Sequence, residues 1–455
     1  MNLKSIHNIY FIGIGGVGMS ALASYFVSLG KTVGGYDKMV SPVTDSLIKL
    51  GVCIQFNSDP SHIDGLFMNT LKTLVVYTPA VSDTNPLLSY FKSNNFQILK
   101  RSEVLGIVTE NTRCLAVAGT HGKTTTSSIL AHLLYQCNEK VTAFVGGISE
   151  NYQSNFIQRG TEVSVVEADE YDRSFLTLSP DFACITSMDA DHLDVYGSED
   201  DLVATFEEFA QKIKPLGKLF IKKGLPFDGI TYAVNEAADY SAVNIQIVDG
   251  IYIFDVQTPS GLIENLHFSL PGAHNLSNAV VALSMAVEFG CSTSGLKNAL
   301  ASYKGVQRRF TYQIKSEEFI FIDDYAHHPT EINAVHQAVR EMYPSKKVAV
   351  VFQPHLFSRT RDFIDAFATS LSQFDATFLL DIYPARESPI SGVDSEWLLG
   401  KINSPIKKLI LKSQIVDEIK DLGYPVFITI GAGDIGVEVS ELKEKLSYAY
   451  KLEFY

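Results

Sequence analysis

The residue types best suited to chemistry stand together in one loop, which has the composition of a triphosphate-binding turn. In chain order the loop consists of Gly119, Thr120, His121, Gly122, Lys123, Thr124 and Thr125. It follows an apolar run at 114–118 and opens a helical pattern from Thr124 to about Tyr135. Backbone N–H groups of such a loop can cradle phosphate oxygens, while Lys123 meets the β/γ charge and the Thr124 hydroxyl ligates Mg²⁺. Val117 stands where the full G-x-x-x-x-G-K-[ST] pattern requires glycine, so this loop is a shortened variant, G-x-x-G-K-T.

A second glycine-rich loop comes earlier in the chain. Residues 13–18 read G-I-G-G-V-G, which matches G-x-G-x-x-G after a strand pattern and before a helix pattern. Glycines there let the backbone approach a pyrophosphate, which rests on the N–H groups of the helix N-terminus. Asp37 ends the next predicted strand, close to the spacing at which an acid would hold a ribose. Alone, this loop indicates NAD, and the alternative is a turn that binds nothing.

Two separate phosphate-binding loops favour one class of reaction over another. A simple nicotinamide dehydrogenase has no use for the triphosphate loop at 119–125. We therefore expect a reaction that joins a nucleotide-bearing substrate to ATP chemistry.

Acidic residues follow two further predicted strands. Residues 167–172 read E-A-D-E-Y-D and residues 189–194 read D-A-D-H-L-D. Carboxylates at strand ends near a triphosphate loop are natural Mg²⁺ ligands or water-positioning groups, and a neutral His192 could join them. For any single acid a solvated loop charge is an equally good interpretation, so the prediction concerns the cluster as a whole.

Three blocks of alternating strand and helix patterns must position these loops, and they predict an α/β fold with mainly parallel sheets. The predicted strands are 9–12, 32–36 and 71–77 in the first block, 114–118, 163–167, 182–186 and 218–221 in the second, and 319–322, 347–352, 376–380 and 426–430 in the third. Between 243 and 270 the closely spaced strands predict a small antiparallel annex. We expect three consecutive domains: a Rossmann-like domain at 1–108, a P-loop-type ATPase domain with the annex at 109–310, and a Rossmann-like domain at 311–455.

Charge and cysteine usage exclude several other classes of protein. With 37 basic and 51 acidic residues the net charge is −14, which disfavours binding to nucleic acid or anionic membranes. The five cysteines form no C-x-x-C pair, which is typical of reduced thiols in a cytosolic protein. The uncharged stretch between Lys4 and Lys31 could suggest a secretory signal, but four central glycines would weaken its helix, and no other segment approaches the ~20 apolar residues of a membrane span. We expect a cytoplasmic protein.

Beyond these motifs, the chain resembles the Mur ligases of peptidoglycan synthesis over essentially its whole length. The matching segments are F-I-G-I-G-G-V-G-M-S at 11–20, G-T-H-G-K-T-T-T at 119–126, E-A-D-E at 167–170, D-A-D-H-L-D at 189–194, P-G-A-H-N at 271–275, R-R-F at 308–310, D-D-Y-A-H-H-P-T-E at 323–331, Q-P-H at 353–355, Y-P-A-R-E at 383–387 and G-A-G-D-I at 431–435. Within the family, the chain is most similar to the ligases that act on UDP-N-acetylmuramate and L-alanine.

This resemblance implies an ATP-dependent ligase that joins L-alanine to the lactyl carboxylate of UDP-N-acetylmuramate. The reaction would pass through an acyl phosphate and release ADP and phosphate. It would belong to the synthesis of peptidoglycan precursors, on which cell shape and cell division depend. The domain at 1–108 would bind the UDP substrate, so its loop would cradle UDP rather than NAD. The domain at 109–310 would bind ATP and Mg²⁺, and the domain at 311–455 the amino acid. A monomer or weak homodimer would suffice.

The resemblance also assigns roles to individual residues. For the UDP substrate these are Gly15, Gly16, Val17, Gly18, Met19 and Ser20. Thr124, Glu167 and His192 would ligate Mg²⁺, His274 and Asn278 would lie by the adenine, and the catalytic set would be Lys123, Arg309, Tyr325, His327 and Arg359. His327 and His328 could instead form a helix-capping turn before Pro329, and Arg359 with Arg361 a solvated helix start. Some members carry a basic residue after Q-P-H where this chain has Leu356, so a substrate contact at that position is in doubt.

Three alternatives remain open at this point. The nearest is the recycling ligase that attaches a peptide to the same sugar nucleotide. An NAD-dependent oxidoreductase is supported only by the loop at 13–18 and Asp37. A nucleotide-gated binding protein without catalysis is the third.

Overall fold

The protein is described from a computed structural model, which defines residues 3–189, 196, 198–248, 250–385 and 387–450. The chain divides into two compact units, each described by itself below. Unit 1 comprises Met1–Ile245, Ile253–Phe268 and Ser277–Lys304, and unit 2 comprises Gln246–Tyr252, Ser269–Leu276 and Gly305–Tyr455.

The first sheet of unit 1 is parallel throughout and has the strand order β3-β2-β1-β4-β5. Its strands are β1 (Asn8–Ile12), β2 (Thr32–Tyr36), β3 (Cys53–Gln55), β4 (Thr73–Tyr77) and β5 (Gln97–Lys100). They alternate with α1 (Val17–Ser28), α2 (Pro42–Lys49), α3 (Pro86–Ser93) and α4 (Arg101–Thr109), with short 3-10 turns at Leu3–Ser5, Pro60–His62 and Gly65–Phe67. Local signals set these helices: Ser41 and Thr44 form a capping box before α2, and the Asn85 side chain caps α3.

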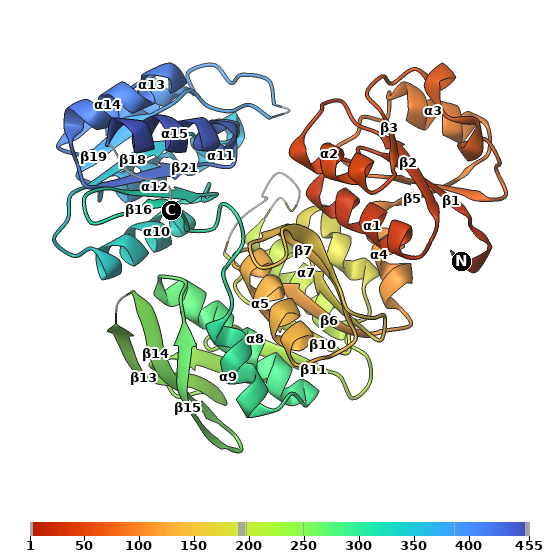
Figure 1. Cartoon of the computed structure of the whole chain (residues 1–455), viewed down its shortest axis with the longest axis horizontal. Helices are drawn as coiled ribbons and strands as arrows, with labels where there is room; N and C mark the ends of the chain where they lie inside the picture. Colours follow the sequence, from red (N-terminus) through yellow and green to blue (C-terminus); the bar gives the residue numbers. More distant parts are fainter. Residues whose placement is uncertain (1–2, 190–195, 197, 249, 386, 451–455) are drawn as a thin grey trace. The chain divides into compact units, whose positions relative to one another are not determined.

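A ten-stranded sheet follows, with the order β15-β14-β13-β12-β11-β10-β6-β9-β7-β8. The strands are β6 (Arg113–Ala118), β7 (Val141–Ser149), β8 (Ser154–Gln158), β9 (Val163–Glu167), β10 (Phe182–Ile185), β11 (Lys218–Lys222), β12 (Ile230–Val234), β13 (Tyr240–Val248), β14 (Ile251–Thr258) and β15 (Gly261–Phe268). The helices are α5 (Lys123–Gln136), α7 (Glu199–Gln211), α8 (Ala273–Phe289) and α9 (Thr293–Ala301), with a 3-10 segment η4 at Tyr171–Thr177. The predicted annex strands are β13 to β15, which continue this sheet at one edge (Figure 1).

Unit 2 is built on a six-stranded sheet with the order β16-β17-β21-β18-β19-β20, in which only the pairing of β16 with β17 is antiparallel. The strands are β16 (Thr311–Lys315), β17 (Ile320–Asp324), β18 (Val348–Phe352), β19 (Ala376–Leu379), β20 (Ile406–Leu409) and β21 (Val426–Ile430). The helices are α10 (Pro329–Met342), α11 (Phe357–Asp362), α12 (Ile364–Leu371), α13 (Ser395–Lys401), α14 (Ile415–Leu422) and α15 (Ile435–Ala449), with a 3-10 turn at Lys412–Gln414.

The predicted central strands are confirmed because their residues are buried on both faces. Every residue of β18 and β21 is buried, as a strand covered by helices on both sides requires. The pair β7 and β8 was not predicted: it runs antiparallel at the edge of the central sheet, and its glycines at 146 and 147 obscure the strand pattern. No helix in the described part of the chain is both long and apolar enough to cross a membrane.

That unpredicted strand pair explains why the first two sheets form one unit. The Tyr25 ring of α1 packs edge-on against Phe144 and Phe156, with ring centroids 5.5 and 6.3 Å apart. The Asn155 amide donates to the carbonyl of Val17 at 2.6 Å. The start of α1, which carries the first glycine loop, is therefore held against the central sheet.

Candidate active site

The loop at 119–125 connects β6 to α5 and requires glycine at two positions. Gly119 has φ +130° and Gly122, the residue before α5, has φ +81°, both in the region that disfavours side chains. A Cβ on Gly119 would overlap the Thr186 hydroxyl of β10, and one on Gly122 would lie 2.6 Å from the Asn278 amide oxygen. Asn278 thus lies against the loop, while its predicted contact with the adenine stays a prediction.

Lys123 is held inside this loop by a buried acid. Its Nζ lies 2.7 and 2.8 Å from the two carboxylate oxygens of Glu170 and donates to the Gly119 carbonyl at 2.8 Å. The Glu170 side chain is 0% exposed and that of Lys123 is 13% exposed. Burial acts to lower the pKa of the Lys123 ammonium, but the charges of Glu170, Asp169 and Glu167 outweigh it and raise the pKa above its ordinary value. Lys123 therefore carries a fixed positive charge.

Two oxygen ligands suited to Mg²⁺ lie beside Lys123. The Thr124 hydroxyl donates to Glu167 Oε1 at 3.1 Å, while Glu167 Oε2 accepts from the Gly146 N–H at 3.0 Å. Among the described residues, no group of three or more His, Cys, Asp or Glu side chains converges on a metal-sized site. Mg²⁺ commonly uses only one or two protein carboxylates, so this pair fits. His192, the third predicted ligand, lies outside the described residues.

The remaining loop residues connect to the segment that follows β10. Thr120 Oγ1 lies 3.0 Å from Ser187 Oγ and accepts from the Asp189 N–H at 3.0 Å. His121 Nε2 lies 3.3 Å from Asp189 Oδ2. Thr125 is buried in the first turn of α5. The two acidic segments predicted from the sequence thus both reach the triphosphate loop, through Glu170 and Asp189.

The first glycine loop is anchored by Asp37, the acid whose spacing suggested that it would bind a ribose. The N–H groups of Gly13 and Ile14 donate to the Tyr36 carbonyl, and the Gly15 N–H donates to Asp37 Oδ2 at 2.7 Å. The register of β1 with β2, which pairs Ile12 with Tyr36, places Asp37 directly beside the loop. Asp37 therefore serves to hold the loop, a role that the spacing did not predict.

The residues after Gly15 form the start of α1. Gly16 precedes the helix with φ −63°, and its first turn comprises Val17, Gly18, Met19 and Ser20. The Ser20 hydroxyl donates to the Val17 carbonyl at 2.9 Å and accepts from the Asn155 amide at 3.0 Å. Ser20 is thus occupied by helix and sheet contacts, whereas Gly16, Val17, Gly18 and Met19 face a cavity.

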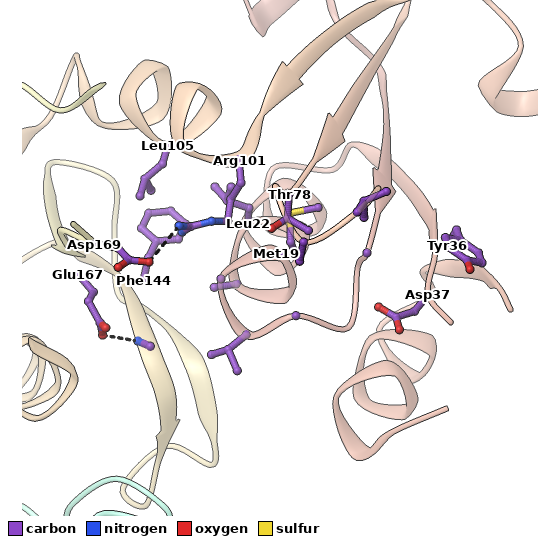
Figure 2. Close-up of a pocket in the computed structure, with 18 of the residues that line it drawn as sticks. Met19, Leu22, Tyr36, Asp37, Thr78, Arg101, Leu105, Phe144, Glu167 and Asp169 are labelled. Atoms are coloured by element: carbon purple, nitrogen blue, oxygen red, sulfur yellow. Dashed lines mark hydrogen bonds and ion pairs between the residues drawn. The ribbon is translucent and has the colours of Figure 1, made fainter. Parts of the chain in front are cut away.

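This cavity extends from the first glycine loop toward the strand that ends at Glu167. It has a volume of about 730 Å³ and is lined at one end by the loop at 13–19 and at the other by Gly146, Glu167 and Asp169 (Figure 2). Glu167 accepts a hydrogen bond from the Thr124 hydroxyl as well, so one residue both lines the cavity and contacts the triphosphate loop. Such a volume accommodates a substrate the size of a sugar nucleotide.

Arg101 lines the same cavity and was missed in the sequence. Its guanidinium lies between α1 and the acids after β9, with Nη2 3.8 Å from Asp169 Oδ2 (Figure 2). The available signal was its position: Arg101 directly follows β5, at the carboxyl end of a parallel strand, where ligands of such sheets gather. Glu170 was predicted only as one acid among several, because nothing local marks it as the partner of Lys123.

In unit 2, three of the predicted residues lie together, and two of them contact one carboxylate. Arg309 Nη1 lies 3.8 Å from Glu331 Oε1, and His327 Nδ1 lies 3.3 Å from Glu331 Oε2. The Arg309 guanidinium lies 5.3 Å from the Tyr325 ring centroid, and the Tyr325 and His327 ring centroids are 5.5 Å apart. The structure therefore brings Arg309, Tyr325 and His327 together. Glu331, for which no role was predicted, contacts Arg309 and His327.

A buried aspartate shapes the two loops that carry these residues. The Asp324 carboxylate accepts from the N–H groups of Phe310 and Ala326, both at 2.7 Å. Burial raises the pKa of Asp324 to about 6, against the opposing effects of the Arg309 charge and the two N–H donors. Its neighbour Asp323 binds Arg308 Nε at 3.0 Å and the Thr429 hydroxyl at 2.8 Å. The pair of aspartates thus fixes the loop conformations from inside.

For the other predicted residues of unit 2, the sequence allowed either a role in the site or a purely structural role at the start of a helix. His328 caps α10, whose first residue is Pro329, so the capping alternative holds for His328. Arg359 is only 7% exposed and is not a solvated helix start, whereas Arg361 is exposed and pairs with Asp362.

Two further positions named in the sequence, Leu356 and His274, each lie at the start of a helix. Leu356, the position in doubt, has φ +72° before α11, a strained conformation for leucine. His274 is exposed in the first turn of α8 and borders Gly272.

Comparisons with known proteins agree with this geometry. Three family models match in succession: Mur ligase family, catalytic domain, at residues 8–113; Mur ligase middle domain at 117–286; and Mur ligase, glutamate ligase domain, at 308–425. The triphosphate loop lies within the second match and the Arg309 cluster within the third.

Individual relatives match over nearly the full length. A UDP-N-acetylmuramate–L-alanine ligase of Flavobacterium johnsoniae is 57% identical over 98% of this chain and 99% of its own. One from Parabacteroides distasonis is 45% identical over 98% of each chain. The crystal structure of a UDP-N-acetylmuramate-alanine ligase from Thermotoga maritima matches with a TM-score of 0.82 and 26% identity, covering 98% of this chain and 99% of that one. With the family models matched in order and relatives this similar over its whole length, the chain belongs to the Mur ligase family.

Proposed function

We propose that this protein joins L-alanine to the lactyl carboxylate of UDP-N-acetylmuramate, with cleavage of ATP and release of ADP and phosphate. The observation that carries the proposal is the cavity between the first glycine loop and Glu167, since Glu167 also contacts Thr124 of the triphosphate loop. The activity named for relatives of up to 57% identity supports it. The NAD interpretation of the first loop gives way to UDP.

The first chemical step activates the carboxylate. A free carboxylate resists attack by an amine because oxide is a poor leaving group, so its oxygen first attacks the γ-phosphorus of ATP and forms an acyl phosphate. Two anions must approach one another in this step. Lys123, fixed by Glu170, and the N–H groups at the start of α5 stabilise the charge that collects on the phosphoryl oxygens. We assign Gly119 to Thr125 and Asn278 to ATP, with His274 as a further adenine contact.

Mg²⁺ belongs to this proposal because the residues present suit it. Thr124 and Glu167 would hold the ion, with His192 as the third protein ligand. When bound, Mg²⁺ neutralises charge on the triphosphate oxygens. The Gly146 N–H holds one oxygen of Glu167 and leaves the other directed to Thr124.

The second step forms the amide. The neutral amine of L-alanine attacks the acyl carbon, and the tetrahedral intermediate expels phosphate. We assign Arg309, Tyr325, His327 and Arg359 to the amino acid and to this step. His327, whose Nδ1 lies 3.3 Å from Glu331 and 3.0 Å from the Tyr325 carbonyl oxygen, is the candidate acceptor of the amine proton.

The assignment of whole segments follows from these roles. We propose that residues 1–108 bind the UDP substrate, 109–310 ATP, and 311–455 the amino acid. Gly15 to Ser20 would form the UDP-binding set, in which Gly15 and Ser20 shape the loop and Gly16 to Met19 contact the ligand. Nothing in the reaction requires nucleic acid or membrane. We further propose a cytoplasmic monomer or weak homodimer, which sedimentation would measure.

One assay separates the candidate functions. Purified protein with ATP, Mg²⁺ and UDP-N-acetylmuramate is supplied in turn with L-alanine, L-serine, glycine and a tripeptide, and phosphate release is measured. We expect release with L-alanine. Release with the tripeptide alone would identify the peptide-adding ligase instead, and ATP binding without release under any condition would indicate a binding protein. Enhanced NADH fluorescence on mixing would support the oxidoreductase.

A further inference from the structure

The position of Arg101 is not explained by the electrostatics of its own helix. It is the first residue of α4, where the helix dipole disfavours a cation. Its side chain is nevertheless only 20% exposed and extends into the cavity of unit 1. A surface role would leave such a long charged side chain in water, so its burial needs another explanation.

The single ion pair of Arg101 is loose. Nη2 lies 3.8 Å from Asp169 Oδ2, beyond hydrogen-bonding distance, and the guanidinium makes no hydrogen bond among the residues that the structure describes. Arginine normally binds an anion through two parallel N–H donors at 2.7–2.9 Å. Asp169 leaves that capacity unused, and a ligand anion in the cavity could take it.

One glycine of the first loop makes room for this guanidinium. A Cβ on Gly18 would lie 2.8 Å from Arg101 Nη1 and 3.1 Å from its Cδ. The third glycine of G-x-G-x-x-G therefore makes room for Arg101 against the first turn of α1. An anion resting on the N–H groups of that turn would meet Arg101 from the side.

The charges around the cavity require such a cation. Among the described lining residues, three are acids, Asp37, Glu167 and Asp169, and the loop itself contains no lysine or arginine. The cations in the same described lining are Lys38, which is exposed, and Arg101. A diphosphate entering this acidic space needs a fixed positive charge near the start of α1, and Arg101 alone of these two is both partly buried and adjacent to Gly18.

We propose that Arg101 is a substrate-binding residue whose guanidinium binds the diphosphate of the UDP substrate, with Asp169 as its weak partner before binding. This inference rests on the proposed function, because it deepens the assignment of the first loop. It also implies that substrate binding separates Arg101 from Asp169, which lies two residues from the Mg²⁺ ligand Glu167 and next to Glu170.

The test is calorimetric titration, without ATP, of UDP-N-acetylmuramate, UDP and uridine into Arg101→Ala, Arg101→Lys and wild-type protein. The matched control is Lys100→Ala, because Lys100 pairs with Asp172 at 3.0 Å and so joins the same two segments without lining the cavity. We expect Arg101→Ala to weaken UDP binding about 10–100-fold, the range of a charge-assisted contact, and to leave uridine binding unchanged. The UDP affinity of Arg101→Lys should lie between those of wild type and Arg101→Ala, since lysine keeps the positive charge but lacks the two parallel N–H donors of the guanidinium.

Each contrary outcome has a distinct meaning. Equal UDP affinity in Arg101→Ala and wild type, or an equal loss in Lys100→Ala, overturns the assignment. A loss confined to UDP-N-acetylmuramate, with UDP unaffected, overturns the diphosphate as the target and places the guanidinium on the lactyl carboxylate. Wild-type protein that fails to bind UDP at all overturns the proposed function of the first loop together with this inference. If Arg101→Ala does not fold, Arg101→Lys decides the same comparison.

Discussion

The two glycine loops of unit 1 share a backbone design and differ in how they handle charge. Each follows a parallel strand, each places a glycine directly before a helix, and each presents the N–H groups of that helix. Yet Gly16 has an ordinary φ of −63° and Gly122 a φ of +81°. At the position directly before the helix, the second loop therefore depends on glycine for its conformation and the first does not, although the first loop has its own left-handed glycine at Gly13, with φ +88°.

Charge separates the loops more sharply. The second loop contains Lys123, locked to a buried Glu170, whereas the first contains no charged residue and is anchored from outside by Asp37. A loop that serves a reacting triphosphate needs a fixed cation where charge develops. A loop that only holds a diphosphate can use backbone N–H groups and a neighbouring side chain. The difference predicts that damage to each loop affects a different kinetic constant.

Lys123→Ala is expected to have the largest effect. Removing a fixed charge from the transferring phosphoryl group should reduce kcat by at least about 10²–10³-fold, while binding of UDP-N-acetylmuramate stays within twofold. Phosphate release and titration calorimetry measure the two quantities. The control is Lys140→Ala, whose side chain is 63% exposed and pairs with Glu162 at the surface. Full turnover by Lys123→Ala would refute the assigned ATP site and with it the contrast between the loops.

Glu170→Gln should mainly reduce stability. It leaves the Lys123 ammonium buried with one fewer counter-charge, and breaking a buried pair by removing one partner costs about 3 kcal/mol. Glu162→Gln is the matched control, since the exposed Lys140–Glu162 pair should contribute under about 1 kcal/mol. Urea unfolding of both variants gives the comparison. Equal losses of unfolding free energy would show that Glu170 does not fix Lys123 in the way the contacts suggest.

Asp37→Asn tests the anchor of the first loop. The carboxylate accepts the Gly15 N–H at 2.7 Å, and a hydrogen bond to a charged group is worth about 2 kcal/mol. Because the loop loosens, KM for UDP-N-acetylmuramate should rise severalfold while KM for ATP does not change. Asp83→Asn, at an acid that is 90% exposed, provides the control. A rise in KM for ATP instead would mean that the two loops are not independent.

The sequence predicted those features that depend on local pattern. Buried β-branched runs such as 163–167 and 426–430 became β9 and β21, and Pro329 began a helix, because burial and backbone restriction act within a few residues. The resemblance assigned Thr124 and Glu167 to one Mg²⁺ site. They lie close together because Glu167 ends β9 and the loop before Thr124 follows the neighbouring parallel strand β6.

Contacts set by tertiary register could not be predicted in the same way. Arg101 reaches the cavity only because α4 and α1 pack together, and the Glu170–Lys123 pair spans 47 residues of sequence. Asp37 illustrates the limit: its spacing fitted a ribose-binding acid, but the pairing of Ile12 with Tyr36 directs it to the Gly15 N–H. One motif position can thus support either a ligand contact or a loop anchor, and only the strand register decides which.

The smallest effects should come from adding a methyl group at the two glycines that precede the helices. Gly122→Ala forces alanine into a left-handed conformation and places a Cβ 2.6 Å from Asn278, so it should cost about 1–2 kcal/mol of stability and weaken ATP binding. Gly16→Ala keeps φ at −63° and meets its nearest atom at 3.5 Å, so stability should change by less than about 0.5 kcal/mol. Because Gly16 lines the cavity, the new methyl group should instead weaken UDP binding. Thermal unfolding and calorimetry on both variants test this pair. Equal destabilisation would show that glycine serves conformation at both positions before the helices, and unchanged UDP binding in Gly16→Ala would mean that the diphosphate does not approach the backbone there.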